Sequence, residues 1–275
     1  MRSIHISLLL VFMCSVLNGQ ISCTQEDSLL FTTKLLEVQE LDLSQELMVP
    51  IGKTFLGTPY VEKTLEIGET ETLVVNLRGL DCTTFVENVL AFSLLIKDNK
   101  SEIQDFTKAL KTIRYRDGLL DGYSSRLHYF TEWIRNNNEK GLVKDITMDL
   151  GGEIQQKTIN FMGTHRELYP FLADDTNFNT ILEVEARLAK ETICVLPQNR
   201  IASQEHNIKN GDIIALATSI TGLDVTHTGL AVKVNDRLHL LHASSSGEVK
   251  ITKEPLVDYL KKIKSNTGII VARPL

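Results

Sequence analysis

The chain has 275 residues, a net charge of -6 at pH 7, and an ordinary globular composition with 43% hydrophobic and 23% charged residues. This is enough chain for one large domain or two small ones with a sizeable buried core. The negative charge, with no basic stripe to neutralise a run of phosphates, excludes a general nucleic-acid-binding surface.

The N-terminus has the pattern of a secretory signal. After a basic start, residues 4–17 are mostly apolar, and small or polar residues follow them. This run is too short to span a bilayer stably. We assign residues 1–22 to a signal peptide and residues 24–275 to a single folded domain, and we expect an exported protein.

Four cysteines occur, at positions 14, 23, 82 and 194. Cleavage after Gly19 gives a simple secreted chain. Cleavage after Ser22 would leave Cys23 at the new N-terminus, as in a bacterial lipoprotein, and a lipid there would tether the protein to a membrane. Gln20 stands where such proteins carry an aliphatic residue, so cleavage without lipidation is favoured.

Cysteine spacing also bears on disulfides and metals. A Cys82–Cys194 disulfide is the alternative to a free thiol at position 82 in an exported protein. No CxxC pair and no HExxH sequence occurs. The sequence therefore predicts neither a metal site nor a cofactor.

Helical periodicity dominates the chain up to about residue 191, interrupted by a short strand at residues 73–77 and by a strand-like segment at residues 143–159. Asp27 is placed to cap the first helix. The short second helix ends in a Gly/Pro turn that presents Tyr60. Tyr60 is either a core aromatic residue, the safer interpretation in isolation, or a hydroxyl donor to an oxyanion near Cys82. The predicted helices cover residues 28–41, 51–60, 82–96, 101–114 and 177–191.

The most informative of these helices begins at Cys82. Asp81 is placed to cap it, and apolar residues recur at helical spacing from Phe85 to Ile96. Unpaired backbone N–H groups converge at such a helix start, and the partial positive charge there lowers the pKa of a thiol. The same N–H groups can bind an oxyanion. A lone cysteine in such a helix is more often an ordinary buried residue. The rest of the chain favours a reactive thiolate here.

A polar and aromatic segment lies between residues 114 and 133. Core packing explains its aromatic residues, but the polar residues among them are typical of a pocket lining. Further on, His165 is either a surface or capping residue or a substrate contact. The candidate substrate-binding set is Asp81, Ser125, Arg126, His128, Tyr129, Trp133, His165 and Thr226.

The pattern then changes from helices to strands. Residues 143–159 predict a hairpin with its turn near residues 151–152. Further on, Asn235-Asp236 is a two-residue turn, so its flanking strands should pair antiparallel and bring His227 near His242 at one sheet edge. His239 lies on the opposite face from His242. The predicted C-terminal strands cover residues 210–216, 225–232, 238–243 and 268–272.

The two halves of the chain need each other. No repeat of roughly 20–50 residues and no low-complexity linker divides them. The strands alone would expose one apolar face, which the helices would cover. The sequence therefore predicts one α+β domain with the cysteine at a helix start and an antiparallel C-terminal sheet.

Five segments in this order resemble the NlpC-like cysteine hydrolases of bacterial cell walls, which have a papain-like fold. Within that superfamily the chain is similar to the N-acetylmuramoyl-L-alanine amidase-like family over nearly its whole mature length. Two features depart from compact relatives: Thr83-Thr84 replaces Ser-Gly, and residues 114–191 form a large insertion between cysteine and histidine. The five segments are 57–60 (GTPY), 81–86 (DCTTFV), 211–214 (GDII), 226–229 (THTG) and 242–244 (HAS).

The resemblance implies a cysteine amidase. Cys82 would be the nucleophile and His227 its base. His242 would orient His227, and Tyr60 would donate to the oxyanion together with a backbone N–H. The insertion would supply the substrate pocket, with Arg126 as the partner of a carboxylate.

The implied substrates are peptidoglycan fragments. These are muropeptides, including 1,6-anhydro forms, cleaved through a thioester between the lactyl group of N-acetylmuramic acid and L-alanine. The resemblance places such an enzyme in the periplasm or cell envelope of a bacterium, and we expect a monomer.

Three alternatives stay open. The same chemistry could cut between D-glutamate and diaminopimelate, as an endopeptidase. The chain could be a non-catalytic peptidoglycan-binding or transport lipoprotein, against which the intact Cys82, His227 and His242 weigh. A metal amidase is the third alternative, which insensitivity to chelators and loss of activity on thiol alkylation would exclude.

Overall fold

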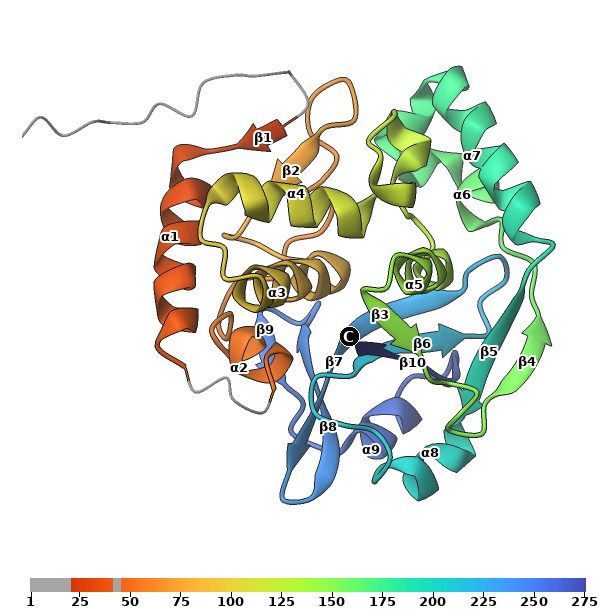
Figure 1. The fold of residues 1–275 in the computed structure, drawn as a ribbon. Helices are drawn as coiled ribbons and strands as arrows, with labels where there is room; N and C mark the ends of the chain where they lie inside the picture. The colour runs from red at the N-terminus through yellow and green to blue at the C-terminus, as the bar shows by residue number, and fades with distance from the viewer. Residues whose placement is uncertain (1–20, 42–45) are drawn as a thin grey trace, which may run out of the picture.

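The computed structural model describes residues 21–41 and 46–275. Figure 1 shows helices of the first half grouped beside a sheet that the last third of the chain completes. This is the mixed α+β arrangement that the sequence predicts, with a helical N-terminal half and an antiparallel C-terminal sheet. The helices of the first half are α1 (Gln25–Gln39), α2 (Met48–Lys53), α3 (Cys82–Lys97), α4 (Ile103–Arg114) and α5 (Phe130–Glu139).

The main sheet has eight strands in the order β4-β5-β10-β6-β7-β8-β9, and β3 pairs with β10 as a branch. Every pairing within this sheet is antiparallel. Its strands are β3 (Val143–Asp145), β4 (Glu153–Gln156), β5 (Thr192–Pro197), β6 (Ile213–Thr218), β7 (Val225–Val234), β8 (Arg237–Ala243), β9 (Val249–Ile251) and β10 (Asn266–Pro274).

The hairpin predicted at Asn235-Asp236 is confirmed. Both residues have positive φ, 50° and 62°, as a two-residue turn that matches the strand twist requires. The turn joins β7 to β8 in the register Leu230↔Leu241. Positions 227 and 242 are thereby brought to the same end of the strand pair.

The hairpin predicted for residues 143–159 is wrong. β3 pairs with the end of β10, and β4 pairs with β5 instead of with β3. Alternation along the chain identified strand-like segments, but it carries no information about which distant strand each one meets.

Two helical boundaries differ instructively from expectation. Thr24, not Asp27, caps α1, because its hydroxyl accepts from the Asp27 N–H at 3.1 Å. Asp27 is buried and instead bonds the Leu77 N–H and the Arg78 side chain. The helix predicted at residues 177–191 is α7 (Asp175–Leu188), capped by Asp174.

The sheet is covered on both faces. One face packs against α3, with Phe85, Leu230 and Leu241 in a shared core. The other face packs against α8 (Gln198–Gln204) and α9 (Leu256–Lys261), whose apolar residues join Leu216 and Leu240. The sheet thus holds α3 and α9 on opposite sides.

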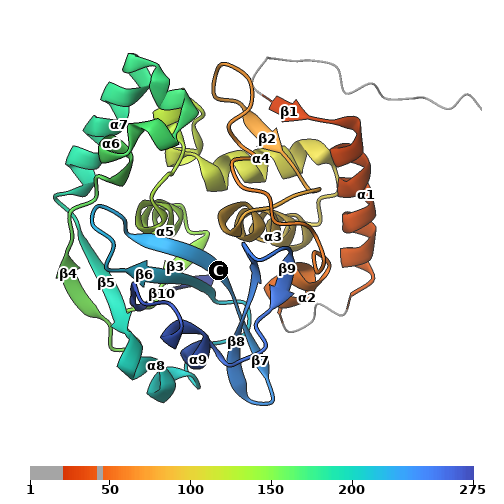
Figure 2. The same cartoon turned by 180° about the vertical axis from the view of Figure 1, so that it is seen from behind.

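The segment between cysteine and histidine has a core of its own. Tyr129, Met162 and Ile181 belong to this third apolar cluster. It includes α6 (Phe161–Thr164) and α7, which lie across the molecule from α1 in both views (Figures 1 and 2). Other parts of the same segment, α5 and the strands β3 and β4, belong to the main core and the main sheet instead.

The predicted signal lies mostly outside the described residues. Residues 21–23 form β1 (Ile21–Cys23), which pairs in parallel with β2 (Leu73–Val75), and Cys23 packs against the main core. Among the helices of residues 21–41 and 46–275, none is both long and apolar enough to cross a membrane.

Candidate active site

A reciprocal cap fixes the start of α3. Asp81 Oδ1 accepts a hydrogen bond of 2.7 Å from the Thr84 N–H, and the Asp81 N–H donates to Thr84 Oγ1 at 2.9 Å. This pair is a capping box with threonine in place of the usual acidic residue. The expected cap is confirmed, and Cys82 lies in the first turn, where backbone N–H groups point out of the helix end.

The strand hairpin brings two histidines together. His227 Nε2 lies 2.5 Å from His242 Nδ1, and the two rings are perpendicular. Since one ring nitrogen of His227 is engaged in this bond, its Nδ1 remains for another partner. His239 faces away, as expected, and its Nδ1 lies 2.8 Å from the Thr252 carbonyl oxygen.

Strand β7 is also tied to the cysteine. Thr228 Oγ1 donates to the Cys82 carbonyl oxygen at 2.9 Å, one residue after His227. Cys82 and His227 line the same cavity of about 140 Å³. The structure therefore brings together the expected nucleophile, base and orienting residue from one helix and two strands.

Burial sets the resting protonation of this group. Burial raises the pKa of the Cys82 thiol to about 11, with the Asp81 carboxylate adding to the increase and contacts from Thr228 and Thr83 opposing it. Burial likewise lowers the pKa of His227 to about 4. These shifts favour a neutral thiol and a neutral imidazole at rest, whereas the sequence predicts a thiolate.

His242 is neutral for the same reason. Burial lowers its pKa to about 3, and positive charge on His227 or Lys250 acts in the same direction. Its Nε2 atom is buried and has no hydrogen-bond partner among the described residues. His242 therefore interacts with the rest of the site through Nδ1.

Tyr60 lies beside the cysteine, as predicted. Its N–H donates to the Gly247 carbonyl oxygen at 2.7 Å, which ties the loop after α2 to the loop after β8. Burial raises the pKa of its phenol to about 12, and charge on Cys82 and Asp81 contributes. The hydroxyl thus stays protonated and can donate a hydrogen bond, and the backbone of Tyr60 forms a bridge with Leu80, just before α3.

Three of the predicted substrate-binding residues line the cavity: His128, Tyr129 and Thr226. Asp81 caps the helix beside it. The Tyr129 hydroxyl donates to Glu185 at 2.6 Å and accepts from the Met162 N–H, so its ring rather than its hydroxyl is offered to a ligand.

The structure places the other four predicted residues away from the cavity lining. Arg126 is 9% exposed and forms ion pairs with Glu66 and Glu71. Trp133 is fully buried. Ser125 Oγ closes a turn on the Gly122 carbonyl, and the His165 ring stacks on Phe161 at the end of α6.

Comparison with known proteins assigns a family to this arrangement. The family model described as AmiA-like, N-acetylmuramoyl-L-alanine amidase-like, matches residues 50–269. The chain belongs to this amidase-like family. A search of curated proteins returns no match.

Solved structures resemble this amidase-like chain over most of its length. An N-acetylmuramoyl-L-alanine amidase from Bacteroides uniformis is 39% identical, with a TM-score of 0.79 over 83% of this chain and 97% of that one. A structure described as a "putative xylanase" from Bacteroides fragilis is 43% identical, with a TM-score of 0.76 over 81% and 98%. A Legionella pneumophila protein, 22% identical with a TM-score of 0.64 over 91% and 93%, shares the fold.

The amidase-like site contains residues that sequence reasoning missed. Asp224 is buried in the cavity lining and accepts from the Thr131 N–H and hydroxyl, both at 2.7 Å. Tyr169 lies in the segment between α6 and α7. Neither position stands in a local motif, so periodicity offered no signal for them.

Tyr259 of α9 was also missed. Its ring lies 5.7 Å from that of His242 at 70°. Burial raises the pKa of its phenol, with charge on Glu254 and Cys82 contributing. A second phenol thus packs against His242, on the side of the sheet that α9 covers.

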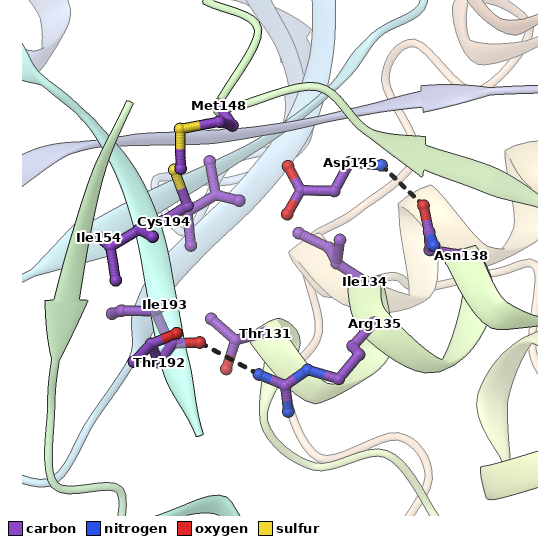
Figure 3. Close-up of a pocket in the computed structure, with 11 residues that line it drawn as sticks. Thr131, Ile134, Arg135, Asn138, Asp145, Met148, Ile154, Thr192, Ile193 and Cys194 are labelled. Atoms are coloured by element: carbon purple, nitrogen blue, oxygen red, sulfur yellow. Dashed lines mark hydrogen bonds between the residues drawn. The ribbon is translucent and has the colours of Figure 1, made fainter. Parts of the chain in front are cut away.

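A larger cavity, of about 390 Å³, lies elsewhere in the amidase-like fold (Figure 3). It lies between α5 and strands β3, β4, β5 and β10, and it shares no lining residue with the cavity of Cys82.

The alternative disulfide does not form, because Cys82 and Cys194 are both free cysteines and Cys194 lines this second cavity. Residues 21–41 and 46–275 contain no group of three or more His, Cys, Asp or Glu side chains that could hold a metal ion.

Proposed function

We propose that this chain is a cysteine amidase that hydrolyses the N-acetylmuramoyl–L-alanine bond of peptidoglycan fragments through a thioester. The observation that supports it most directly is the convergence of Cys82 and His227 on one cavity, with His242 bonded to His227. Family membership supports the amide as the bond that is cut.

The first half of the reaction begins from the neutral pair. His227 Nδ1 takes the thiol proton as the Cys82 sulfur attacks the lactyl carbonyl carbon. The oxyanion accepts hydrogen bonds from the Tyr60 hydroxyl and the Cys82 N–H. When the C–N bond breaks, His227 gives its proton to the leaving L-alanine nitrogen, and the muramoyl group stays on sulfur as a thioester.

The second half repeats the proton transfers with water. His227 Nδ1 takes a proton from water, which attacks the thioester carbonyl, and returns it to the sulfur as the C–S bond breaks. His227 can act this way only if its own proton sits on Nε2 and points to His242 Nδ1. His242 therefore fixes the tautomer that leaves Nδ1 free as a base.

A glycosidase role has less support. Glycoside hydrolysis usually uses two carboxyl groups on either side of the scissile bond. Asp224 is the one carboxylate in the lining of the Cys82 cavity as the structure describes it, and its oxygens accept from Thr131 and the Val225 N–H. This lining supports the proposed thiol mechanism over hydrolysis by two carboxyl groups.

The cellular setting is part of the proposal. We propose that the protein is exported to the periplasm or cell envelope of a bacterium after removal of a signal. There it would act as a monomer with a papain-like NlpC-type catalytic domain. Its substrates would be muropeptides, including 1,6-anhydro forms. Cleavage after Gly19 would keep β1 whole, whereas cleavage after Ser22 would remove two of its three residues. The pairing of β1 with β2 therefore supports the first position over a lipid at Cys23.

Product identity tests the proposal. Purified mature protein is incubated with an anhydro-disaccharide tripeptide, beside Cys82→Ala, and products are identified by mass spectrometry. We expect free anhydro-disaccharide and intact tripeptide with the wild type, and neither with the variant. Release of diaminopimelate, with L-Ala-D-Glu left on the sugar, would make the protein an endopeptidase instead.

A further inference from the structure

We infer that the 140 Å³ cavity beside Cys82 is the subsite for the uncharged sugar of the substrate, a ring bearing hydroxyl and N-acetyl groups, and not for its anionic peptide. This inference rests on the proposed function and assigns the two ends of the substrate to the two sides of the nucleophile. It follows from the hydrogen-bonding groups, the charges and the apolar surface of the lining.

The cavity offers neutral hydrogen-bonding groups. Tyr169 and Thr226 line it, and no hydrogen bond within the described part of the chain occupies either side-chain hydroxyl. Burial, with the nearby Glu66, Glu185 and Asp224, raises the pKa of the Tyr169 phenol to about 12, so its hydroxyl remains a donor. Sugar hydroxyl groups and an acetyl carbonyl are suitable partners for such groups.

His128 supplies an acceptor to the same cavity. Its Nε2 lies 2.8 Å from the Tyr123 carbonyl oxygen, which can only accept, so the ring carries a proton on Nε2. Burial and the neighbouring Arg126 hold the pKa of His128 well below its usual value, so the ring is neutral and Nδ1 has no proton. Nδ1 can accept from an amide N–H or a hydroxyl of a ligand.

The charges around the cavity exclude a carboxylate. The described lining contains neither lysine nor arginine, and its one acidic side chain is Asp224. Arg126, expected to bind a substrate carboxylate, is already held by Glu66 and Glu71 at 3.5 and 3.2 Å. The stem peptide carries carboxylates, whereas the muramoyl carboxyl is consumed in the scissile amide, so the sugar end is the one that such a site accepts.

The rest of the lining suits the body of a sugar. Phe130, Met162 and Leu223 give apolar surface, and the ring of Tyr129 adds an aromatic face. The volume is on the order of ten times what one water molecule needs, so the cavity can hold a group the size of a ring. Apolar walls with a few placed polar groups are typical of a small-molecule site.

Substrate truncation combined with one substitution tests the inference. Two substrates share the scissile amide and the peptide: N-acetylmuramoyl tripeptide, and D-lactoyl tripeptide, which lacks the sugar. Tyr169→Phe should lower kcat/KM for the muramoyl substrate about tenfold, the loss of one hydrogen bond, and leave the lactoyl substrate within about twofold. Tyr259→Phe is the matched control: it removes a phenol hydroxyl from a ring that packs against His242 outside the cavity lining, and it should change kcat/KM for both substrates by the same factor.

Two outcomes would overturn the inference. One is an equal effect of Tyr169→Phe on both substrates. The other is a loss of kcat/KM in Tyr169→Phe that changes when muramoyl-L-alanine replaces the muramoyl tripeptide as substrate. Such a dependence on peptide length would mean that the cavity holds the peptide.

Binding separates this inference from the proposed function. If the wild type cleaves neither substrate, the proposed function fails, and calorimetry with Cys82→Ala then decides the subsite. N-acetylmuramic acid amide should bind, and Tyr169→Phe should weaken its Kd about tenfold. Binding of the free tripeptide in its place would contradict the assignment.

Discussion

The Nε2 atom of His227 and the Nδ1 atom of His242 lie 2.5 Å apart across the β7–β8 hairpin, with their ring planes perpendicular. This contact couples the two rings, because the position of the proton between them decides which nitrogen of His227 can act as a base. His242 is buried and His227 is half-buried, and desolvation lowers the pKa of both rings far enough to keep them neutral at pH 7. The contact therefore orients His227 without adding charge to the site.

Removing the orienting ring should slow the chemistry. His242→Ala should lower kcat about 10²-fold, because His227 then loses the tautomer and orientation that place Nδ1 as the base. His242→Asn keeps a side-chain acceptor and should recover part of the rate. His239→Gln is the control, a buried histidine of the same strand on the opposite face, and should leave kcat within about twofold. Wild-type kcat in His242→Ala would show that the ring contact has no catalytic role.

The pH dependence of kcat/KM should show whether Cys82 and His227 are neutral at rest. Activity requires His227 to be unprotonated, so it should be lost only as the pH falls through about 4, the folded pKa of His227. An exposed histidine would place this limb near 6.5 instead. Initial rates between pH 3.5 and 9 measure the limb, and an acidic limb between 6 and 7 would contradict the buried neutral base.

The same burial should make the fold sensitive to acid. The folded pKa values of His227 and His242 lie below the unfolded value near 6.5, so the unfolded state binds more protons as the pH falls. Their stabilising contribution is complete above about pH 6.5 and is lost below it, at up to about 1.4 kcal/mol per pH unit for each histidine. Urea unfolding at pH 7, 6 and 5 should show this decline, and His242→Gln should show a shallower one. Parallel slopes would mean that His242 is not buried neutral.

Asp81 combines a structural and an electrostatic role that two substitutions separate. Asp81→Ala should cost about 1 kcal/mol of unfolding free energy, the loss of a helix cap. Asp81→Asn keeps the accepting oxygen and should cost less. Both substitutions remove the carboxylate that raises the pKa of Cys82, so both should speed alkylation by iodoacetamide at pH 8. Unchanged alkylation in both would show that Asp81 does not control the thiol.

The arrangement of the candidate catalytic residues could be predicted from short stretches of sequence. The cap at Asp81 and the helix beginning at Cys82 depend on residues within one turn. The proximity of His227 and His242 depends on a two-residue turn between adjacent strands. Helix caps and tight turns depend on neighbouring residues, so a single sequence is enough to predict them.

The substrate pocket could not be predicted in the same way. Arg126 was expected at a ligand, but its partners Glu66 and Glu71 are contributed by a loop more than fifty residues earlier, so only the fold shows that its charge is already paired. Tyr169 and Asp224 meet in one cavity from segments far apart in the chain.

Burial was equally invisible in sequence. A helix start lowers a thiol pKa, and the sequence showed that contribution alone. The desolvation of Cys82 depends on the tertiary packing around it, and this contribution raises the pKa of the thiol.

Trapping the acyl-enzyme is the measurement that tests the central claim most directly. Wild-type protein mixed with N-acetylmuramoyl-L-alanine is quenched in acid within the first turnover and examined by intact-protein and peptide mass spectrometry. The mechanism predicts a muramoyl group on the peptide that contains Cys82, and its absence from Cys82→Ala. A Cys82→Ala protein that hydrolyses the substrate as fast as the wild type, without forming an adduct, would contradict the mechanism. A muramoyl group on another residue would contradict it as well.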